Sequence, residues 1–416
     1  MNLEILTIGD ELLLGFTLDT NAAHLARVLS ALGVSVVRRG TVGDDADRLA
    51  AAVREALDRT GAVITTGGLG PTADDRTRDV IAAVFGRTLR RDDAILAQVA
   101  SRFEKLGVAM PPSNVSQAMI PEGARILPNR HGTAPGLWLE DDRGRWCAML
   151  PGVPREMRGM LKEELLPLLA ARVGPDPTVI VSRTIRTVGI GESALAEQLG
   201  DLSRGVDGFP VAFLPSWSGV DLRLTSAERR APSAETALAS AATKLKARIA
   251  RYVYAEDETD LAAVVLTLCR EKQVKLATAE SCTGGLLGAR LTAIPGSSDV
   301  YLGGVVAYAN EVKEGELDVS DALLREHGAV SEPVVSAMAE GAAARLGAGV
   351  SIAITGIAGP DGGTSEKPVG TIFIAVRANG ETRAANRVFL GDREEIRLRA
   401  TQGALDMVRR LLSPQI

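Results

Sequence analysis

The sequence has few aromatic residues and no excess of positive charge. Phe, Trp and Tyr make up 3% of its 416 residues, and Asp and Glu (52) outnumber Lys and Arg (47), which gives a formal net charge of −5. Non-specific nucleic-acid binding requires a dense basic surface. This composition therefore argues against a nucleic-acid partner.

Cysteine is also scarce, and long apolar runs are missing. Cys147, Cys269 and Cys282 are widely separated, so their spacing provides neither a disulfide framework nor a zinc site, and a reducing compartment fits best. No apolar run approaches the ~20 residues of a membrane-spanning helix. The start, "MNLEILTIGDELLLG", is acidic where a signal peptide would be basic. We therefore expect a cytoplasmic protein with no membrane partner.

The length of the chain predicts two or three domains. Short β-branched runs alternate with amphipathic stretches in residues 1–172 and again in 257–416, which indicates two α/β domains with mostly parallel sheets. Between them, residues 173–256 have the texture of a small α+β module. We predict a strand at 3–9 and helices at 20–33 and 260–272, followed by C-terminal strands at 274–280, 303–309, 349–355 and 370–376 and a final helix.

The stretch "TAESCTGG" (278–285) places hydroxyl and thiol groups where a predicted strand leads into a helix. Unpaired N–H groups and the helix dipole at that point can activate Ser281 as a nucleophile and stabilise an oxyanion. Two other interpretations stay open on these residues alone. The loop can bind a phosphate without any chemistry, or Ser281 or Thr283 can simply cap the helix.

A lysine follows in the stretch "YANEVK" (308–313). Asn310 is typical of an N-cap, which puts Lys313 in the first turn of a helix, where a cation opposes the dipole. Burial and the helix terminus are both expected to lower its pKa towards that of a general base. The alternative is a solvated lysine on an exposed helix.

Two further stretches contain candidate ligand-binding groups. Thr355 and Gly356 end a predicted buried strand before a glycine-rich loop, a position where α/β sheets bind ligands. Near the C-terminus, Arg393, Arg397 and Arg399 are candidates for binding a phosphate. The alternative interpretation is that they are ordinary surface arginines on an exposed helix.

Acidic residues follow two predicted strands of the N-terminal domain. Asp10 and Glu11 come after the first strand, and Asp74 and Asp75 follow the glycines of residues 67–70. Carboxylates beside a phosphate-binding glycine loop fit a bound divalent metal. A tight glycine turn with an aspartate N-cap is the alternative.

Residues 260–415 resemble the CinA C-terminal domain, the family of nicotinamide mononucleotide deamidases. The likeness rests on "AESCTGG", "PGSS", "YANEVK", "HGAVSEPVV", "TGIAGPDGG", "KPVGT" and "GDREEIRLRAT", in this order. It implies hydrolysis of nicotinamide mononucleotide to nicotinic acid mononucleotide and ammonia without a cofactor. Ser281 would be the nucleophile, activated by Tyr308 and Lys313. The implied substrate-binding residues are Thr283, Gly284, Gly285, Asn310, Thr355, Gly356, Arg397 and Arg399.

Residues 1–170 resemble the molybdopterin-binding fold of the MogA/MoaB family and, more closely, the N-terminal domain of CinA. "PNRHGTAPG" (128–136) and "LPGVPREM" (150–157) complete the likeness. It implies metal-dependent hydrolysis of ADP-ribose to AMP and ribose 5-phosphate. The implied ligands of a divalent metal (Mg, Mn or Co) are Asp10, Asp74 and Asp75. The implied substrate-binding residues are Gly67, Gly68, Gly70, Thr72, Asn129, Gly132 and Thr133.

The middle segment resembles the KH-like linker of CinA proteins, with "GIGE" (189–192) at the position of a nucleic-acid-gripping loop. Such loops are normally basic, and Glu192 makes a structural spacer the better interpretation. The whole resemblance implies two three-layer α/β domains joined by a KH-like module, in a bifunctional, homodimeric enzyme of pyridine-nucleotide recycling. A molybdopterin-binding protein of cofactor assembly and a non-catalytic partner of the competence and recombination machinery are the alternatives.

Overall fold

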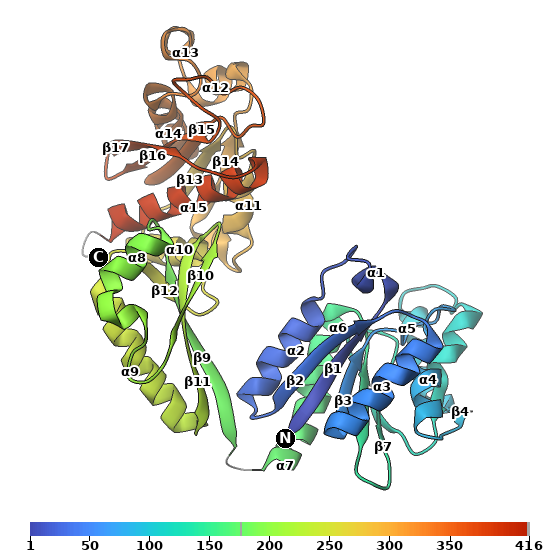
Figure 1. Cartoon of the computed structure of the whole chain (residues 1–416). Helices are drawn as coiled ribbons and strands as arrows, with labels where there is room; N and C mark the ends of the chain where they lie inside the picture. The colour runs from blue at the N-terminus through green and yellow to red at the C-terminus, as the bar shows by residue number, and fades with distance from the viewer. Residues whose placement is uncertain (175–176, 414–416) are drawn as a thin grey trace. The chain divides into compact units, whose positions relative to one another are not determined.

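The computed structural model describes residues 1–174 and 177–413, and the chain divides into two compact units (Figure 1). Unit 1 comprises residues 1–181 and 226–235, and unit 2 comprises residues 182–225 and 236–416. No helix within the described ranges is both long and apolar enough to cross a membrane.

Unit 1 is built on a six-stranded sheet in which four neighbouring strands are parallel, the fifth is antiparallel to them, and the sixth pairs antiparallel with the fifth. This agrees with the mostly parallel sheet that the sequence predicts. In spatial order the strands are β2 (Ser35–Val42), β1 (Asn2–Ile8), β3 (Ala62–Thr66), β8 (Trp146–Leu150), β7 (Gly136–Glu140) and β6 (Arg125–Leu127). A separate two-stranded sheet pairs β4 (Leu89–Arg91) with β5 (Met119–Pro121).

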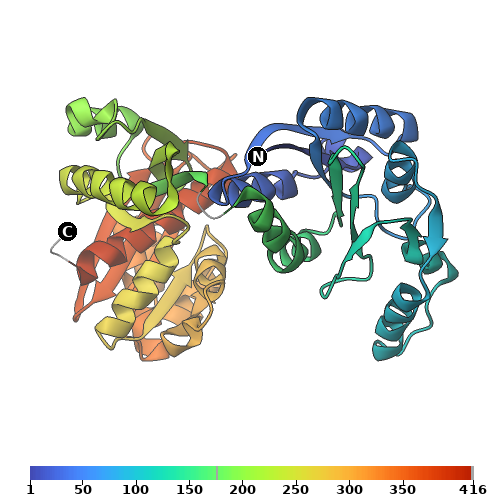
Figure 2. The same cartoon turned by 90° about the horizontal axis from the view of Figure 1, so that it is seen from below.

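Helices cover both faces of this sheet (Figures 1 and 2). Strand β1 shows why: Leu3 and Ile5 pack in a core with helices α2 (Thr20–Ala31) and α6 (Pro154–Met160), whereas Leu6 and Ile8 pack in another core with α3 (Ala46–Thr60) and α4 (Thr77–Val84). Successive side chains of a strand point to opposite faces, so a strand with apolar residues on both faces needs a layer on each side. The helices of unit 1 are α1 (Asp10–Leu13), α2 (Thr20–Ala31), α3 (Ala46–Thr60), α4 (Thr77–Val84), α5 (Asp93–Lys105), α6 (Pro154–Met160) and α7 (Leu166–Val173), with a 3₁₀ segment at Pro112–Ala118 and a π-helical turn at Leu161–Leu165.

A four-stranded sheet with two helices forms what we call the middle module, as the α+β texture of 173–256 predicts. Its strands, in spatial order, are β10 (Val211–Ser216), β11 (Gly219–Arg230), β9 (Thr178–Thr187) and β12 (Val253–Glu256). Its helices are α8 (Glu192–Leu199) and α9 (Ala231–Ile249), with a 3₁₀ turn at Gly200–Ser203.

The C-terminal domain contains a five-stranded sheet in which β14, β13 and β15 are parallel, and β16 and β17 are antiparallel. The strands are β13 (Leu276–Glu280), β14 (Tyr301–Val306), β15 (Val350–Gly356), β16 (Thr371–Ala378) and β17 (Glu381–Val388). The helices are α10 (Leu261–Glu271), α11 (Leu286–Thr292), α12 (Asn310–Leu317), α13 (Asp321–His327), α14 (Glu332–Leu346) and α15 (Arg393–Leu412), with a 3₁₀ turn at Ser297–Asp299.

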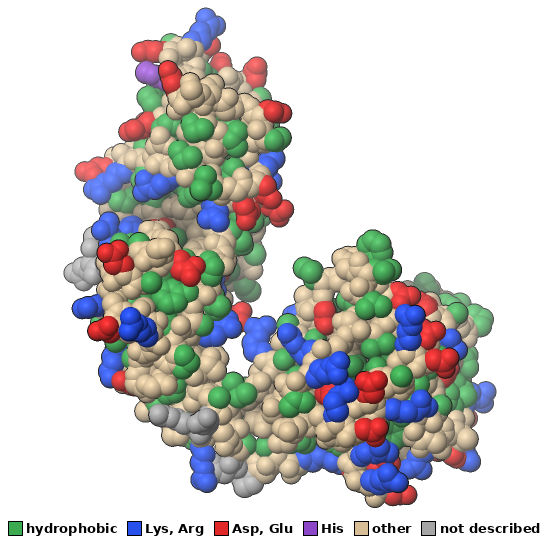
Figure 3. All heavy atoms as spheres, in the orientation of Figure 1, with side chains coloured by type: hydrophobic (Ala, Val, Ile, Leu, Met, Phe, Trp, Pro, Cys, Tyr) green, Lys and Arg blue, Asp and Glu red, His purple; other side chains and the backbone are tan. Residues whose placement is uncertain are grey.

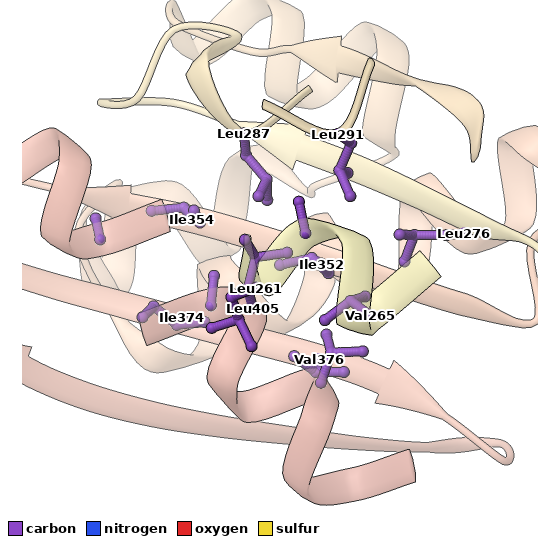
Figure 4. Close-up of a cluster of buried hydrophobic side chains, with 14 of the residues drawn as sticks. Leu261, Val265, Leu276, Leu287, Leu291, Ile352, Ile354, Ile374, Val376 and Leu405 are labelled. Atoms are coloured by element: carbon purple, nitrogen blue, oxygen red, sulfur yellow. The ribbon is translucent and has the colours of Figure 1, made fainter. Parts of the chain in front are cut away.

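This sheet is also covered on both faces. On one face, Leu276 of β13 and Ile352 of β15 pack against Leu261 of α10, Leu287 of α11 and Leu405 of α15 (Figure 4). On the other face, small residues of the same strands pack against α14. Because both faces are covered, the free positions for chemistry are the loops at the carboxyl ends of β13, β14 and β15.

Candidate active site

Ser281 follows directly after β13, and its backbone is fixed by the neighbouring strand. Its N–H donates to the carbonyl oxygen of Ile354 in β15 at 2.9 Å, and its side chain is 9% exposed. The chain then turns sharply through Gly284 and Gly285, whose φ angles are +59° and +91°. Glycine adopts this left-handed region without steric cost, so the glycine pair allows Ser281 to stay at the strand end.

The helix after this loop is capped by neither Ser281 nor Thr283, so that interpretation of the sequence is wrong. The residue before the first turn of α11 is Gly285, and the carboxylate of Glu280 accepts the N–H groups of Gly285 (3.1 Å), Leu287 (3.0 Å) and Gly288 (2.8 Å). Glu280 is 1% exposed. Sequence reasoning missed it, although an acidic residue directly before a glycine-containing loop and a helix start is the signal that could have found it.

Glu280 also determines which N–H groups of the loop remain available. The N–H of Gly285 is taken by Glu280, and that of Gly284 donates to the carbonyl oxygen of Ser281 at 3.0 Å. Among residues 1–174 and 177–413, no other residue accepts the N–H groups of Cys282 or Thr283. The Thr283 side chain is fully buried, and its hydroxyl has no hydrogen-bond partner there.

Of Ser281 and Cys282, the cysteine is the stronger intrinsic nucleophile, but its surroundings lower the reactivity of its thiol. Burial raises the pKa of the Cys282 thiol to about 12. Because the thiolate is the reactive form of cysteine, this thiol stays protonated and weakly nucleophilic at neutral pH.

Lys313 lies in the first turn of α12, as predicted, and is buried (1% exposed). Its ammonium nitrogen donates to the carbonyl oxygens of Ala307 (2.9 Å), Tyr308 (3.2 Å) and Ala309 (3.5 Å). Burial lowers the pKa of Lys313, and the nearby Cys282 and Glu311 oppose that fall in pKa. The predicted direction of the pKa shift is therefore confirmed, and the solvated-lysine alternative is wrong.

Asn310 is not the N-cap of α12 that the sequence predicts. Ala309 holds the cap position in an extended conformation, and Asn310 is the first helical residue. No cap hydrogen bond from a side chain is made at this helix start. Helix α12 therefore begins one residue earlier than an Asn310 cap predicts, and β14 ends at Val306 rather than at residue 309.

Tyr308 and two arginines surround the same loop. Tyr308 is 62% exposed, and its hydroxyl accepts a hydrogen bond from Arg393 at 3.1 Å. Arg397 donates to the carbonyl oxygen of Thr283 at 2.7 Å. Within the described part of the chain no hydrogen bond connects Ser281 with Tyr308 or Lys313.

Arg399 is separated from the other two arginines by the geometry of α15. Residues four apart share a helix face, so Arg393 and Arg397 lie together near Thr283. Arg399 instead lines a cavity between α15, β17 and the middle module. The structure therefore does not bring the third predicted phosphate ligand to the Ser281 loop.

Thr355 and Gly356 lie at the end of β15, but their polar groups serve the fold. The hydroxyl of Thr355 donates to the carbonyl oxygen of Ala329 at 2.9 Å. A side chain at Gly356 would come within 2.6 Å of the carbonyl oxygen of Thr371, so this glycine is required for strand packing.

In the N-terminal domain, Asp10 pairs with a residue that sequence reasoning missed. The N–H of Asp10 donates to the Asp44 carboxylate at 3.0 Å, and the N–H of Asp44 donates to the Asp10 carboxylate at 3.3 Å. The pKa of Asp44 is raised, first by burial and then by the negative charges of Asp10, Glu11 and Asp74. The signal was available, because Asp44 follows the carboxyl end of β2 just as Asp10 follows that of β1.

Asp75 is turned into its own loop. Its carboxylate accepts the N–H of Thr72 at 2.9 Å and the Thr72 hydroxyl at 2.5 Å. Across the described ranges of the chain, no group of three His, Cys, Asp or Glu residues is arranged to hold a metal ion. The predicted set of Asp10, Asp74 and Asp75 therefore does not fit a metal site as arranged, and its role stays a prediction.

The glycine loop after β3 is explained by close packing. Side chains at Gly67, Gly68 and Gly70 would come within 2.2 Å of the Ile8 carbonyl oxygen, 2.1 Å of the Thr77 hydroxyl and 2.4 Å of the Asp75 carboxylate, respectively. A phosphate-binding role for these glycines remains a prediction.

The "PNRHGT" loop is held together by Asn129. Its amide donates to the Ala134 carbonyl oxygen and the Glu156 carboxylate, and its oxygen accepts the N–H groups of residues 131 and 132. Asn129, Gly132 and Thr133 line a small cavity of about 200 Å³ beside α5.

Comparisons with known proteins match all three parts of the chain. Residues 4–171 match the family described as probable molybdopterin binding domain, residues 182–255 the damage-inducible protein CinA KH domain, and residues 258–412 the CinA C-terminal domain. These matches, in this order, define the class of protein.

Full-length relatives agree with this class. A "CinA-like protein" of Gemmatimonas aurantiaca is 61% identical over 411 residues, covering 99% of this chain and 96% of the relative. A "putative competence-damage inducible protein" of Symbiobacterium thermophilum is 47% identical over 420 residues, covering 98% of both. A crystal structure of CinA from Thermoplasma acidophilum is 40% identical and covers 39% of this chain and 94% of that one, with a TM-score of 0.36. The chain belongs to the CinA family.

Proposed function

We propose that the C-terminal domain hydrolyses the carboxamide of nicotinamide mononucleotide to give nicotinic acid mononucleotide and ammonia, with Ser281 as the nucleophile. The observation that carries this proposal is Lys313, a buried lysine whose pKa is lowered and which lies near the loop that holds Ser281. A neutral lysine at this position is a general base of the kind that activates a serine hydroxyl.

In the first step, the Ser281 oxygen attacks the carboxamide carbon and its proton passes to the Lys313 nitrogen. A neutral amine carries two protons and one lone pair, so Lys313 can keep its two shorter carbonyl contacts and give up the 3.5 Å contact to Ala309. The oxyanion that forms would accept the N–H groups of Cys282 and Thr283, because no other described residue uses them.

In the second step, the C–N bond breaks and the proton on Lys313 moves to the departing nitrogen, which leaves as ammonia. Water then attacks the Ser281 ester, releases the acid and returns the proton to the Ser281 oxygen. Arg393 and Arg397 supply positive charge beside the loop for the phosphate of the substrate. The activating role that the family resemblance implies for Tyr308 stays a prediction; its hydrogen bond to Arg393 also supports a role in orienting the substrate at the open side of the site.

The test is ammonia release from nicotinamide mononucleotide by the full chain, with chelator present. We expect turnover by the native protein and a loss of at least 10³-fold in the Ser281→Ala variant. Cys282→Ala is the matched control, because its thiol is kept protonated, and should keep most of the activity. Loss of activity in Cys282→Ala with activity retained in Ser281→Ala would reject Ser281 as the nucleophile.

For the N-terminal domain we propose metal-dependent hydrolysis of ADP-ribose to AMP and ribose 5-phosphate. The supporting observation is that Asp10, Glu11 and Asp74 lie close enough to Asp44 for their negative charges to act on it, as residues that attract a cation would. Within the described residues these carboxylates are not arranged as a metal-binding set.

AMP release from ADP-ribose should require added Mg²⁺, Mn²⁺ or Co²⁺ and should fall strongly in Asp44→Asn. Asp58→Asn, whose partner is the exposed end of Arg145, is the control. Tight binding of a molybdopterin-type ligand without ADP-ribose turnover would favour the alternative of cofactor assembly.

A further inference from the structure

A second cavity, unrelated to Ser281, lies within unit 2 between the middle module and the C-terminal domain. Its volume is about 660 Å³, within the usual range of small-molecule sites. The walls come from the loop before α8, the β10–β11 turn, strand β17 and helix α15. None of its lining residues belongs to the loops that hold Ser281 or Lys313.

The charge of the cavity wall is strongly positive. Four arginines line it against one buried acidic residue, Asp406. Arg410 pairs with Asp406 at 2.7 Å, and the same carboxylate also pairs with Arg409 at 2.8 Å. The other three make no ion pair within residues 1–174 and 177–413; they are Arg251, Arg387 and Arg399.

Among these arginines, Arg399 gives the strongest indication of a bound anion. Its Nε atom is buried and has no hydrogen-bond partner among the described residues. A buried N–H without a partner is unfavourable, and it is more so on a charged group. An anion in the cavity would satisfy this donor, and guanidinium groups bind phosphate oxygens with matching geometry.

The cavity lining also contains aromatic residues, which are rare in this chain. Trp217, Tyr252 and Phe389 line it, and each is half-buried. Arg290 lies over the Trp217 ring at 5.2 Å from its centroid, which holds the indole in place. Aromatic side chains of this kind stack on a planar base.

The two halves of the cavity are held together by buried hydrogen bonds, so the cavity is largely preformed. Gln402 of α15 donates to the Ser218 carbonyl oxygen at 2.7 Å and accepts from Arg290 at 2.7 Å. Arg409, also on α15, donates to the carbonyl oxygens of Val253 (3.2 Å) and Arg251 (3.1 Å). Preorganisation of this kind reduces the entropy cost of binding.

We propose that this cavity binds a nucleoside phosphate, with the base stacked on Trp217 and the phosphates bound by Arg387 and Arg399. A free nucleotide is favoured over a nucleic-acid strand because the basic groups converge in a hollow, whereas charges of both signs are interspersed over the face seen in Figure 3. Helix α15 lines the cavity with Arg399 and contacts the Ser281 loop through Arg397. A nucleotide bound in the cavity can therefore affect the Ser281 loop through this helix.

The test uses the fluorescence of Trp217 in the full chain, titrated with ADP, with inorganic pyrophosphate and with adenosine. The other two tryptophans, Trp138 and Trp146, stack on one another in unit 1, so Trp217→Phe identifies the signal from the cavity. We expect ADP to quench Trp217, with Kd raised about tenfold or more in Arg399→Gln and in Arg387→Gln.

Arg383→Gln is the matched control, because Arg383 lies on the same strand, is 63% exposed and does not line the cavity. It should bind ADP as the native protein does. Trp217→Ala should weaken binding of ADP, measured by calorimetry, but not of pyrophosphate. Thermal unfolding of each variant identifies any that fail to fold.

Three results would overturn the proposal: equal ADP affinity in native, Arg399→Gln and Arg387→Gln proteins, equal affinity for pyrophosphate and ADP, or quenching by a single-stranded oligoribonucleotide but not by ADP. Because no substrate of the Ser281 site is present, the result is independent of the proposed deamidase.

Discussion

The carboxylate of Glu280 accepts the backbone N–H of Leu287 at 3.0 Å, in a site where Glu280 is 1% exposed. This contact and its two neighbours hold the start of α11 and, with it, the turn that follows Ser281. A carboxylate that is buried with three N–H donors is a positioning group for the loop.

Replacing Glu280 with Gln should weaken these three hydrogen bonds without changing the size of the side chain. The amide offers one oxygen instead of two and turns N–H groups towards backbone donors, so the free energy of unfolding should fall by about 1–3 kcal/mol. Chemical denaturation measures this loss. Glu326→Gln, at an exposed position of α13, should leave stability unchanged.

The Glu280→Gln variant also shows whether Glu280 positions the Ser281 loop or only stabilises the folded protein. If Glu280 orients the Ser281 loop, kcat for nicotinamide mononucleotide should fall in Glu280→Gln at temperatures where the variant is fully folded, with little change in KM. An unchanged kcat in the folded variant would limit Glu280 to a structural role.

Arg397 should contribute to substrate binding more than to the chemical step. It already donates to the Thr283 carbonyl oxygen at 2.7 Å, so its guanidinium is held beside the proposed site. Arg397→Gln is expected to raise KM about tenfold or more with a smaller effect on kcat, and Arg397→Lys should restore part of the affinity. Arg383→Gln serves as the control, and an unchanged KM in Arg397→Gln would place the substrate phosphate elsewhere.

The junction between α15 and the middle module should depend on Gln402. Its buried amide hydrogen-bonds both Ser218 and Arg290. Arg290 keeps its ion pair with Asp260 in Gln402→Leu, but the Ser218 carbonyl oxygen loses this donor, at a cost of about 1–3 kcal/mol. Hydrogen exchange of residues 217–219 should speed up in this variant. Gln198→Leu, at an exposed site on α8, should not alter exchange there, and equal exchange in both variants would show that the junction does not depend on Gln402.

Much of the fold could be predicted from the sequence because apolar runs and their spacing are strong signals. The strand predicted at 3–9 is β1 (Asn2–Ile8), and the helix predicted at 260–272 is α10 (Leu261–Glu271). Strand β17 (Glu381–Val388) was missed, because this edge strand is polar and exposed along most of its length. An apolar pattern requires a buried face, which much of an edge strand does not have.

The candidate site was predictable in part for a similar reason. Lys313 was identified because a lysine in the first turn of a helix breaks a local rule, and its burial confirms the interpretation. Glu280, Asp44 and the cavity around Arg399 were not identified. Glu280 contacts a residue five positions away, whereas the contacts of Asp44 and of the cavity join segments up to more than 200 residues apart. No local sequence pattern indicates these long-range contacts.

Lys313 provides the last prediction, which concerns pH. Burial lowers its pKa below the ordinary value of 10.5. If the neutral amine is the general base, kcat should rise as pH increases through the folded-state pKa and level off above it. The unfolded state binds more protons between the folded-state pKa and 10.5, so the free energy of unfolding should also rise with pH over this window, with no further contribution from Lys313 above it. Lys313→Met should lower kcat by about 10²–10⁴-fold and remove the acidic limb from the residual activity, whereas Lys313→Arg should be equally inactive because arginine stays charged. Rate profiles and denaturation measured at matched pH values test both effects, and an acidic limb that persists in Lys313→Met would assign it to another group.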